Sequence, residues 1–206
     1  MTFPDQKFDN IQAYTRAYFD QVRRAQDSLG ADALNAALEI MGGAYERGAT
    51  LYVCGNGGSA SISNHLVCDH SKCIQTDTPV VPRTVSLASN MEMVTAIAND
   101  ISYDDVFVYQ LKTLAQKGDV LVTVSSSGDS ENVVRAAEWA KDNGIDVIAM
   151  TGFEGGRTGK MADAHLHVDG DNYGVVEDVH QSLMHIYAQY IRQNLMAPDL
   201  IKQRKF

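Results

Sequence analysis

Two sets of residues with helical spacing carry the groups best suited to chemistry. His65 and Asp69 are four residues apart, and Glu177, Gln181 and His185 follow one another at the same interval. Residues four apart project from one face of a helix. Two imidazoles and two carboxylates make a tetrahedral donor set for Zn²⁺, although Fe²⁺, Mn²⁺ or Ni²⁺ accept the same donors. The alternative is that the histidines are satisfied core residues and the acids are solvated.

Two serine-glycine loops of one design suggest an anionic ligand. Cys54–Ser59 reads CGNGGS and Ser125–Ser130 reads SSSGDS, and each lies between an apolar run and a helix-like stretch. Free N–H groups and the positive end of a helix dipole hold an anion at such places. The first loop lacks the dinucleotide fingerprint, and neither carries the Gly-Lys-Ser/Thr of a P-loop. We therefore predict a phosphate monoester, the alternative being that serine and glycine only form turns and caps.

A third loop, at residues 151–156, also follows an apolar run, at residues 147–150. We interpret it as a structural exit from a strand, because it offers no run of hydroxyl groups.

Composition limits the class of protein. The chain has 206 residues and a net charge of −9, which predicts one domain and argues against a nucleic-acid surface. Its apolar runs fall short of the roughly 20 residues of a membrane span, and no signal peptide is visible. Three cysteines without zinc-finger spacing fit free thiols, and hence a cytoplasmic protein.

The elements that must position these residues alternate along the chain. Residues 8–46 read as helical, divided near Gly30, with Asp32 as the candidate N-cap of the second helix. Strand-like and helix-like runs then alternate, which predicts a parallel sheet with helices on both faces and ligands beyond the carboxyl ends of the strands. The predicted strands are 50–54, 84–87, 119–124, 145–150 and 165–168. The predicted helices are 59–72, 90–99, 104–116, 130–143, 157–162 and 175–195.

These motifs together resemble the SIS (sugar isomerase) domain family, and within it the phosphoheptose isomerases, from about residue 8 to residue 195. The matching segments are Gly55–Ser59, His65, Asp69, Ala98-Asn99-Asp100, Ser125–Ser130, Thr151-Gly152 and Glu177–His185. The resemblance implies an α/β fold with a five-stranded parallel flavodoxin-like sheet flanked by helices. It also implies one SIS domain over residues 1–206, with an N-terminal helical arm for assembly (1–46), an α/β core (47–196) and a tail (197–206).

The resemblance also implies a reaction and an assembly. Family members convert a ketose phosphate into an aldose phosphate for heptose synthesis, as homotetramers with active sites between subunits, and many bind zinc. It places the metal ligands at His65, Asp69, Glu177 and His185, and the acid–base pair at Asp69 and His185. The family usually has Glu at position 69 and Gln at 177. A charged Glu177 should strengthen cation binding and lower the Lewis acidity of the metal.

Further residues implied to bind substrate lie in both loops and beyond. They are Asn56, Gly57, Ser59, Asp100, Ser125, Ser126, Ser127, Ser130 and Glu177. Cys73 stands where the family commonly has an arginine that contacts substrate, and the adjacent Lys72 lacks the forked geometry of a guanidinium. The residues expected to bind the phosphate and the reactive end of the sugar therefore match the family, whereas those expected to contact the middle of the sugar differ from it.

The leading hypothesis is an aldose–ketose isomerase, an intramolecular oxidoreductase, acting on sedoheptulose 7-phosphate through an enediol(ate) with help from a metal. One alternative is an isomerase for another ketose phosphate of a polysaccharide or antibiotic-sugar pathway. A second is a non-catalytic regulator that binds a protein such as the replication initiator DnaA. A sugar-phosphate sensor of a transcription factor is least supported, because the chain has no basic patch. The partners expected are a sugar phosphate and further copies of the chain, with no nucleic acid or membrane.

Overall fold

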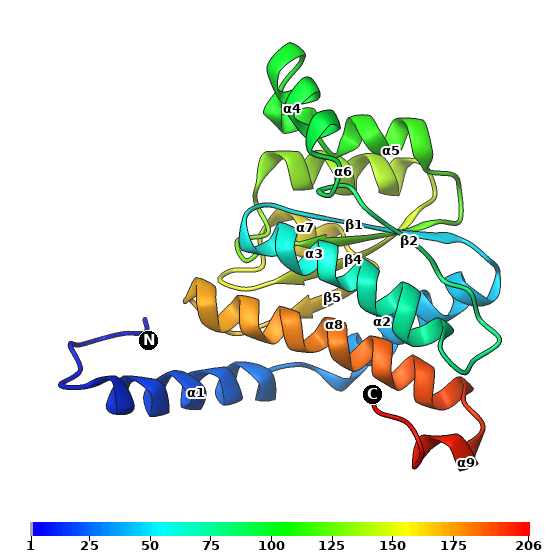
Figure 1. Ribbon diagram of the computed structural model, residues 1–206. Coiled ribbons are helices and arrows are strands. Elements are labelled where there is room, and N and C mark those ends of the chain that lie inside the picture. The colour runs from blue at the N-terminus through cyan, green and yellow to red at the C-terminus, as the bar shows by residue number, and fades with distance from the viewer. Residues whose placement is uncertain (1) are drawn as a thin grey trace.

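The computed structural model describes residues 2–206 as a five-stranded parallel sheet with helices on both faces (Figure 1). The sheet order is β2-β1-β3-β4-β5, with every neighbouring pair parallel, which is the flavodoxin-like order. The fold class and all five strand predictions are confirmed to within one residue. The strands are β1 (Thr50–Gly55), β2 (Arg83–Ser86), β3 (Val120–Val124), β4 (Asp146–Thr151) and β5 (Ala164–His167).

The helices follow the predicted alternation. Two short segments, η1 and η2, are a π-helix and a 3₁₀-helix. The segments in chain order are α1 (Ile11–Asp27), α2 (Ala31–Glu46), α3 (Gly58–Cys68), η1 (Asp69–Ile74), α4 (Met91–Asp100), η2 (Tyr103–Asp105), α5 (Val108–Leu114), α6 (Glu131–Asp142), α7 (Gly156–Met161), α8 (Tyr173–Leu195) and α9 (Pro198–Ile201).

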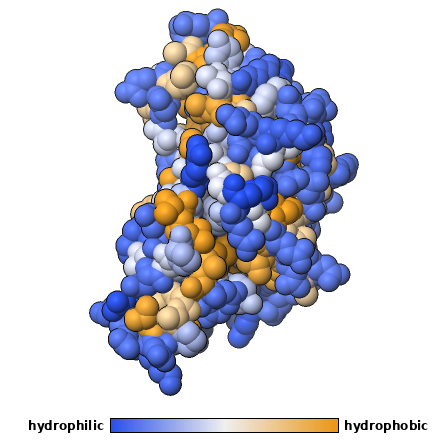
Figure 2. Space-filling model, turned by 90° about the vertical axis from the view of Figure 1, so that its right-hand side faces the viewer, coloured by the Kyte–Doolittle hydropathy of each residue, from blue (hydrophilic) through white to orange (hydrophobic). Residues whose placement is uncertain are grey.

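The surface carries apolar side chains in patches between polar regions (Figure 2). On the N-terminal helix α1, Ile11 is 70% exposed and Phe19 is 64% exposed. Within residues 2–206, the helices lack the combination of length and apolar character needed to cross a membrane.

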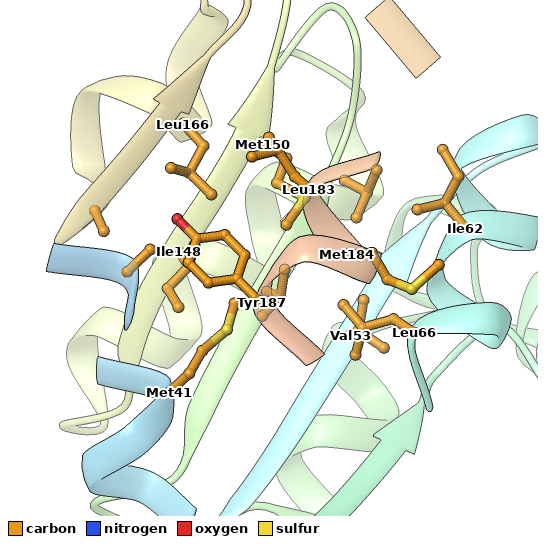
Figure 3. Close-up of a cluster of buried hydrophobic side chains, with 14 of the residues drawn as sticks. Met41, Val53, Ile62, Leu66, Ile148, Met150, Leu166, Leu183, Met184 and Tyr187 are labelled. Carbon is orange, nitrogen blue, oxygen red and sulfur yellow. The ribbon is translucent and has the colours of Figure 1, made fainter. Parts of the chain in front are cut away.

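The sheet separates two hydrophobic cores. Parallel strands covered on both faces are buried throughout, as β3 is, because each side chain meets a helix whichever way it points. One core joins the sheet to α2, α3 and α8, with Val53, Ile148 and Leu183 among its members (Figure 3). The other joins the opposite face to α4, α5 and α6. Helices α3 and α8, which carry His65 and His185, therefore share one face of the sheet.

A side chain caps the N-terminus of α1, whereas α2 begins without a side-chain cap. Helix α1 starts at Ile11 because the Asn10 side chain accepts a hydrogen bond from the backbone N–H of Ala13 at 2.9 Å. It lies along α8 (Figure 1). The prediction of Asp32 as the cap of the next helix is wrong. Gly30 holds that place with an extended backbone, and Asp32 falls in the first turn, where its charge still complements the helix dipole.

The segment predicted as one helix over residues 59–72 divides into an α-helix and a π-helix. Helix α3 ends at Cys68, and the chain continues as a π-helix from Asp69 to Ile74. This wider turn buries His70, whose Nδ1 lies 2.6 Å from the Tyr45 hydroxyl. A π-turn within a helix is rare and frequently marks a functional site.

Helix α8 buries a histidine against the end of β4. His180 is fully buried, and its Nε2 lies 3.2 Å from the backbone oxygen of Thr151. Burial lowers the pKa of His180 to about 4, because the charged imidazolium would lose its hydration.

This shift predicts an acid-sensitive fold. An exposed histidine has a pKa of about 6.5, so below that pH the unfolded chain binds a proton at position 180 that the folded chain rejects. The free energy of unfolding should therefore fall between pH 6.5 and 4, by up to about 3 kcal/mol from this group, and this contribution should level off below pH 4. Urea denaturation at pH 7, 6, 5 and 4 measures it. His180→Gln should give a shallower slope over that range, and equal slopes would contradict the assignment.

Candidate active site

Four side chains from two elements meet between α3/η1 and α8. His185 Nδ1 lies 2.6 Å from Asp69 Oδ2, and His65 Nε2 lies 3.4 Å from Asp69 Oδ1. On the other side, Gln181 Nε2 lies 2.9 Å from His65 Nδ1 and 3.1 Å from His185 Nε2. The Asp69 carboxylate and the Gln181 amide thus each bridge both imidazoles. The two rings stand edge to face, with their centroids 4.9 Å apart.

This ring of contacts fixes which nitrogens carry protons. The Gln181 amide nitrogen only donates, so it requires an acceptor nitrogen on each histidine. The remaining nitrogens, His65 Nε2 and His185 Nδ1, then carry hydrogen and face the Asp69 carboxylate. Asp69 thus orients both imidazoles, and the far ring nitrogen of each accepts a hydrogen bond from Gln181.

The ring forms because α3 and η1 run alongside α8 in the same direction (Figure 1). Three contacts mark their register: Gly58 with Glu177, His65 with Gln181, and Asp69 with His185. The steps are seven and four residues along α3/η1 and four residues each along α8, so residues one or two helical turns apart form a polar seam between two helices.

Glu177 lies at the loop end of this seam. A Cβ built on Gly58 would approach Glu177 Oε2 to 2.3 Å, so a larger residue at position 58 would require the Glu177 side chain to move. Burial raises the pKa of Glu177, and the neighbouring Asp178 carboxylate raises it further. The eight-residue rise to His185 is about 12 Å along α8. Glu177, which we predicted as a fourth metal ligand, is not among the three residues whose ligand atoms lie within 4.8 Å of one another, and its role as a ligand stays a prediction.

The other three predicted ligands fit a divalent metal. One ligand atom from each of His65, Asp69 and His185 lies within 4.8 Å of the others. Two imidazoles and one carboxylate suit Zn²⁺, and equally other first-row transition metals. Gln181, which we did not predict as a site residue, lies beside both imidazoles, and its place in the i, i+4, i+8 row was the available signal.

The second serine-glycine loop, Ser125–Ser130, uses two of its serines to shape the turn. The Gly128 N–H donates to the Ser125 hydroxyl at 3.2 Å, and the Asp129 N–H donates to the Ser127 hydroxyl at 3.2 Å. Gly128 takes a φ of +67°, which favours glycine. The turn-forming interpretation therefore holds for part of this loop.

The other two predicted serines of this loop are available to a ligand. The Ser126 hydroxyl is buried and, within residues 2–206, has no hydrogen-bond partner. Ser130 is the N-cap of α6, but its side chain makes no capping hydrogen bond. A buried hydroxyl without a partner is costly, and an anion at the N-terminus of α6 would satisfy both groups.

The third loop, at residues 151–156, packs against the second serine-glycine loop, Ser125–Ser130. A Cβ on Gly156 would come within 2.4 Å of the Gly128 carbonyl carbon and the Ser127 oxygen, and a Cβ on Gly128 would come within 2.3 Å of the Gly155 oxygen. Thr158 donates to the Gly128 oxygen from its N–H at 3.0 Å and its hydroxyl at 3.1 Å. Beyond serving as a strand exit, this loop braces the anion-binding turn, backbone against backbone.

Arg157 adds a charged clamp that the sequence did not reveal. Its Nε donates to Asp129 Oδ1 at 3.0 Å, and another guanidinium nitrogen donates to the Asp129 backbone oxygen at 2.9 Å. Hydrogen bonds from Arg157 lower the pKa of Asp129. The clamp offsets a negative charge beside the turn in which we predict an anion.

The first loop is tied to the second by a pair of amides. Asn56 and Asn132 exchange hydrogen bonds of 2.9 and 3.0 Å, and the Tyr103 hydroxyl donates to Asn56 Oδ1 at 2.9 Å. Gly57 is the N-cap of α3 with a φ of +54°, and Ser59 is buried in its first turn. Neither Asn132 nor Tyr103 was predicted.

Asp100 lies apart from the acid–base cluster. It ends α4, which packs on the sheet face opposite α3 and α8. Its carboxylate is exposed and accepts a hydrogen bond from the Asn99 amide at 2.7 Å. Within one chain, therefore, the structure does not bring Asp100 to the histidines.

Known proteins share this arrangement of sequence and fold. The family model of the SIS domain matches residues 15–152. The phosphoheptose isomerase of Mycobacterium tuberculosis is 36% identical over 154 residues, which make up 75% of this chain and 78% of the relative. The probable phosphoheptose isomerase of Thermoplasma acidophilum is 34% identical over 85% of this chain and 96% of its own. A phosphoheptose isomerase structure from Neisseria gonorrhoeae superposes with a TM-score of 0.80 at 30% identity, covering 88% and 98% of the two chains.

The brace between the loops predicts an unusual sensitivity at Gly156. Gly156→Ala should destabilise the fold twice over, through a φ of +58° and through overlap with the backbone of Ser127 and Gly128. Gly48→Ala is the matched control, because Gly48 has a φ of +70° and nothing within 4 Å of its Cβ position. In both variants the free energy of unfolding should fall by about 1–2 kcal/mol, because alanine is disfavoured in the left-handed backbone conformation.

In urea denaturation, Gly156→Ala should lose at least about 2 kcal/mol more than the control, as an overpacked site does. Its affinity for inorganic phosphate should fall as well. Equal unfolding free energies for the two variants would contradict the brace.

Proposed function

The chain belongs to the SIS-domain family, and we propose that it is an aldose–ketose isomerase of the phosphoheptose isomerase type, acting on sedoheptulose 7-phosphate. The observation that carries this proposal is the bridging of two histidines by the Asp69 carboxylate between α3/η1 and α8. Relatives named phosphoheptose isomerase, 34–36% identical over most of the chain, support the substrate class.

The reaction needs a base, an acid and a group that stabilises charge on oxygen. Moving a carbonyl from C2 to C1 removes a proton from one carbon and returns it to the other, through an enediol(ate). All three functions must act within a few ångströms, because proton transfer requires hydrogen-bond reach.

Asp69 and His185 supply the acid–base pair. Their 2.6 Å contact lets a proton taken by one be shared with the other. In our proposal Asp69 transfers the proton between the carbons, and His185 acts at the other carbon or at oxygen. His65 and Gln181 hold both groups in orientation from the opposite side of the ring.

A divalent metal, Zn²⁺ in the first instance, fits His65, Asp69 and His185. When bound, such an ion polarises a carbonyl and so makes the neighbouring C–H more acidic. The position of Glu177 against Gly58 favours a contact with the sugar over its predicted role as a metal ligand.

The substrate then spans from the loops to the seam. The phosphate would lie on Ser126, Ser130 and the N-terminus of α6, with Ser125 and Ser127 shaping the turn. The sugar would pass the loop of Asn56, Gly57 and Ser59. From Gly58 to His65 the rise along α3 is about 10 Å, which suits an extended sugar phosphate.

We further propose a cytoplasmic homotetramer with active sites between subunits. The exposed apolar residues Ile11 and Phe19 on α1, and Ile186 and Tyr190 on α8, supply surface for assembly. The Asp100 carboxylate, remote from the histidines within one chain, would then reach the site of a neighbouring subunit. A monomer in sedimentation equilibrium at micromolar concentration would contradict this assembly.

A different ketose phosphate is the second candidate. Cys73, Asp69 and Glu177 stand where the related family commonly has other side chains, so the part of the site that reads the sugar is altered. The intact ring of His65, Asp69, Gln181 and His185 disfavours a purely protein-binding regulator.

Proton exchange tests the reaction directly. Incubation with sedoheptulose 7-phosphate and other ketose phosphates in D₂O should place deuterium beside the carbonyl. His185→Gln should lower turnover by at least about 10²-fold, while Ser182→Ala, an exposed change on the same helix, should not. Unchanged turnover in His185→Gln would remove this residue from the mechanism.

Metal analysis of the purified protein tests the ligand set. We expect about one divalent transition metal per chain, lost in His65→Ala and retained in His167→Ala. Glu177→Ala should keep the metal but raise KM if Glu177 contacts sugar, whereas loss of metal would restore it as a ligand. Full occupancy in His65→Ala would contradict the site.

A further inference from the structure

The two serine-glycine loops are joined by a small polar network that the reaction as described does not use. Asn56, in the first loop, exchanges two amide hydrogen bonds with Asn132, the second residue of α6 behind the second loop. The hydroxyl of Tyr103, on η2, donates to Asn56 Oδ1 at 2.9 Å. Three segments that are distant in the chain thus converge on one carboxamide.

The hydrogen-bond network is buried at Asn132 and exposed at Tyr103. Asn132 is 2% exposed, so an alternative partner from water is denied to it. Tyr103 is 54% exposed and covers the network from outside. A buried amide that exchanges both a donor and an acceptor with its neighbour is costly to break, because both groups would be left without partners.

Within residues 2–206, the hydrogen bonds of the Asn56 side chain leave one of its amide hydrogens free. The Asn56 oxygen accepts from both Asn132 and Tyr103, and its nitrogen donates one hydrogen to Asn132. An amide nitrogen has two hydrogens, so one remains for a ligand. The network therefore sets the direction of a single N–H at the edge of the first loop, where a polyol hydroxyl could accept it.

We propose that Asn132 is a positioning residue and Tyr103 a specificity-determining residue for an acyclic sugar phosphate. Together they fix the distance between the loop that holds the phosphate and the loop that starts α3, and so select the length of the carbon chain. This inference rests on the proposed function for the identity of the ligand, but the tie between the loops does not depend on it.

Chain-length selection follows from the geometry of the seam. In our proposal the phosphate would lie at the loop that follows β3, whereas Asp69 and His185 lie on η1 and α8. A sugar of the wrong length would place its carbonyl away from the acid–base pair. An error of about 1 Å there is enough to cost about 10²-fold in rate.

Binding of unreactive polyol phosphates tests the inference without catalysis. Calorimetry would give Kd for arabitol 5-phosphate, sorbitol 6-phosphate and the seven-carbon alditol 7-phosphate with wild type, Tyr103→Phe and Asn132→Ala. In the two variants, the ratio of Kd values between the most weakly and the most tightly bound alditol phosphate should fall by about fivefold to tenfold. This is the effect of one well-placed hydrogen bond. Inorganic phosphate affinity should change little.

The control is Tyr109→Phe, which removes a similarly exposed hydroxyl on the neighbouring helix α5 and should leave the preference unchanged. Tyr103→Phe keeps the inference testable if Asn132→Ala fails to fold. An unchanged preference in Tyr103→Phe, or a wild-type protein that binds the three alditol phosphates equally, would overturn it. Turnover of ketose phosphates by wild type tests the proposed function separately.

Discussion

The Asp69 carboxylate is the interaction on which the candidate site depends. It contacts His65 from its own side and His185 from α8, so one short side chain joins two helices that are 116 residues apart in the chain. Gln181 closes the ring on the far side with two donated hydrogens. Because both acceptors and both donors are matched, the imidazoles have defined protonation and orientation before any substrate arrives. The chemistry proposed for them follows from that order.

The sheet makes the ring possible by controlling where the helices start. All five strands end at the same edge, and α3, α6 and α7 begin in the loops that leave β1, β3 and β4. The loops are held by different means: a carboxamide pair joins the first to the second, while glycine backbones and Arg157 join the second to the third. An anion bound at the middle loop would therefore be supported from both sides by rigid neighbours.

The sequence predicted what depends on local pattern. Alternating apolar runs located the five strands, and helical spacing grouped His65 with Asp69 and Gln181 with His185. It could not supply the register between α3 and α8, because two helices packed on a sheet can slide by a turn at little local cost. Nor could it locate partners formed only by tertiary contact, such as Asn132 with Asn56 or Arg157 with Asp129.

The contact of Gly58 with Glu177 has a consequence for how the sequence of this protein can change. The carboxylate occupies the volume that any side chain at position 58 would need, so the two positions share one fixed space. A methyl group can enter at 58 only after residue 177 shortens or turns away. A larger residue at position 58 should therefore accompany a shorter or repositioned side chain at position 177, 119 residues away. Change at the start of α3 is thereby linked to the carboxylate at position 177.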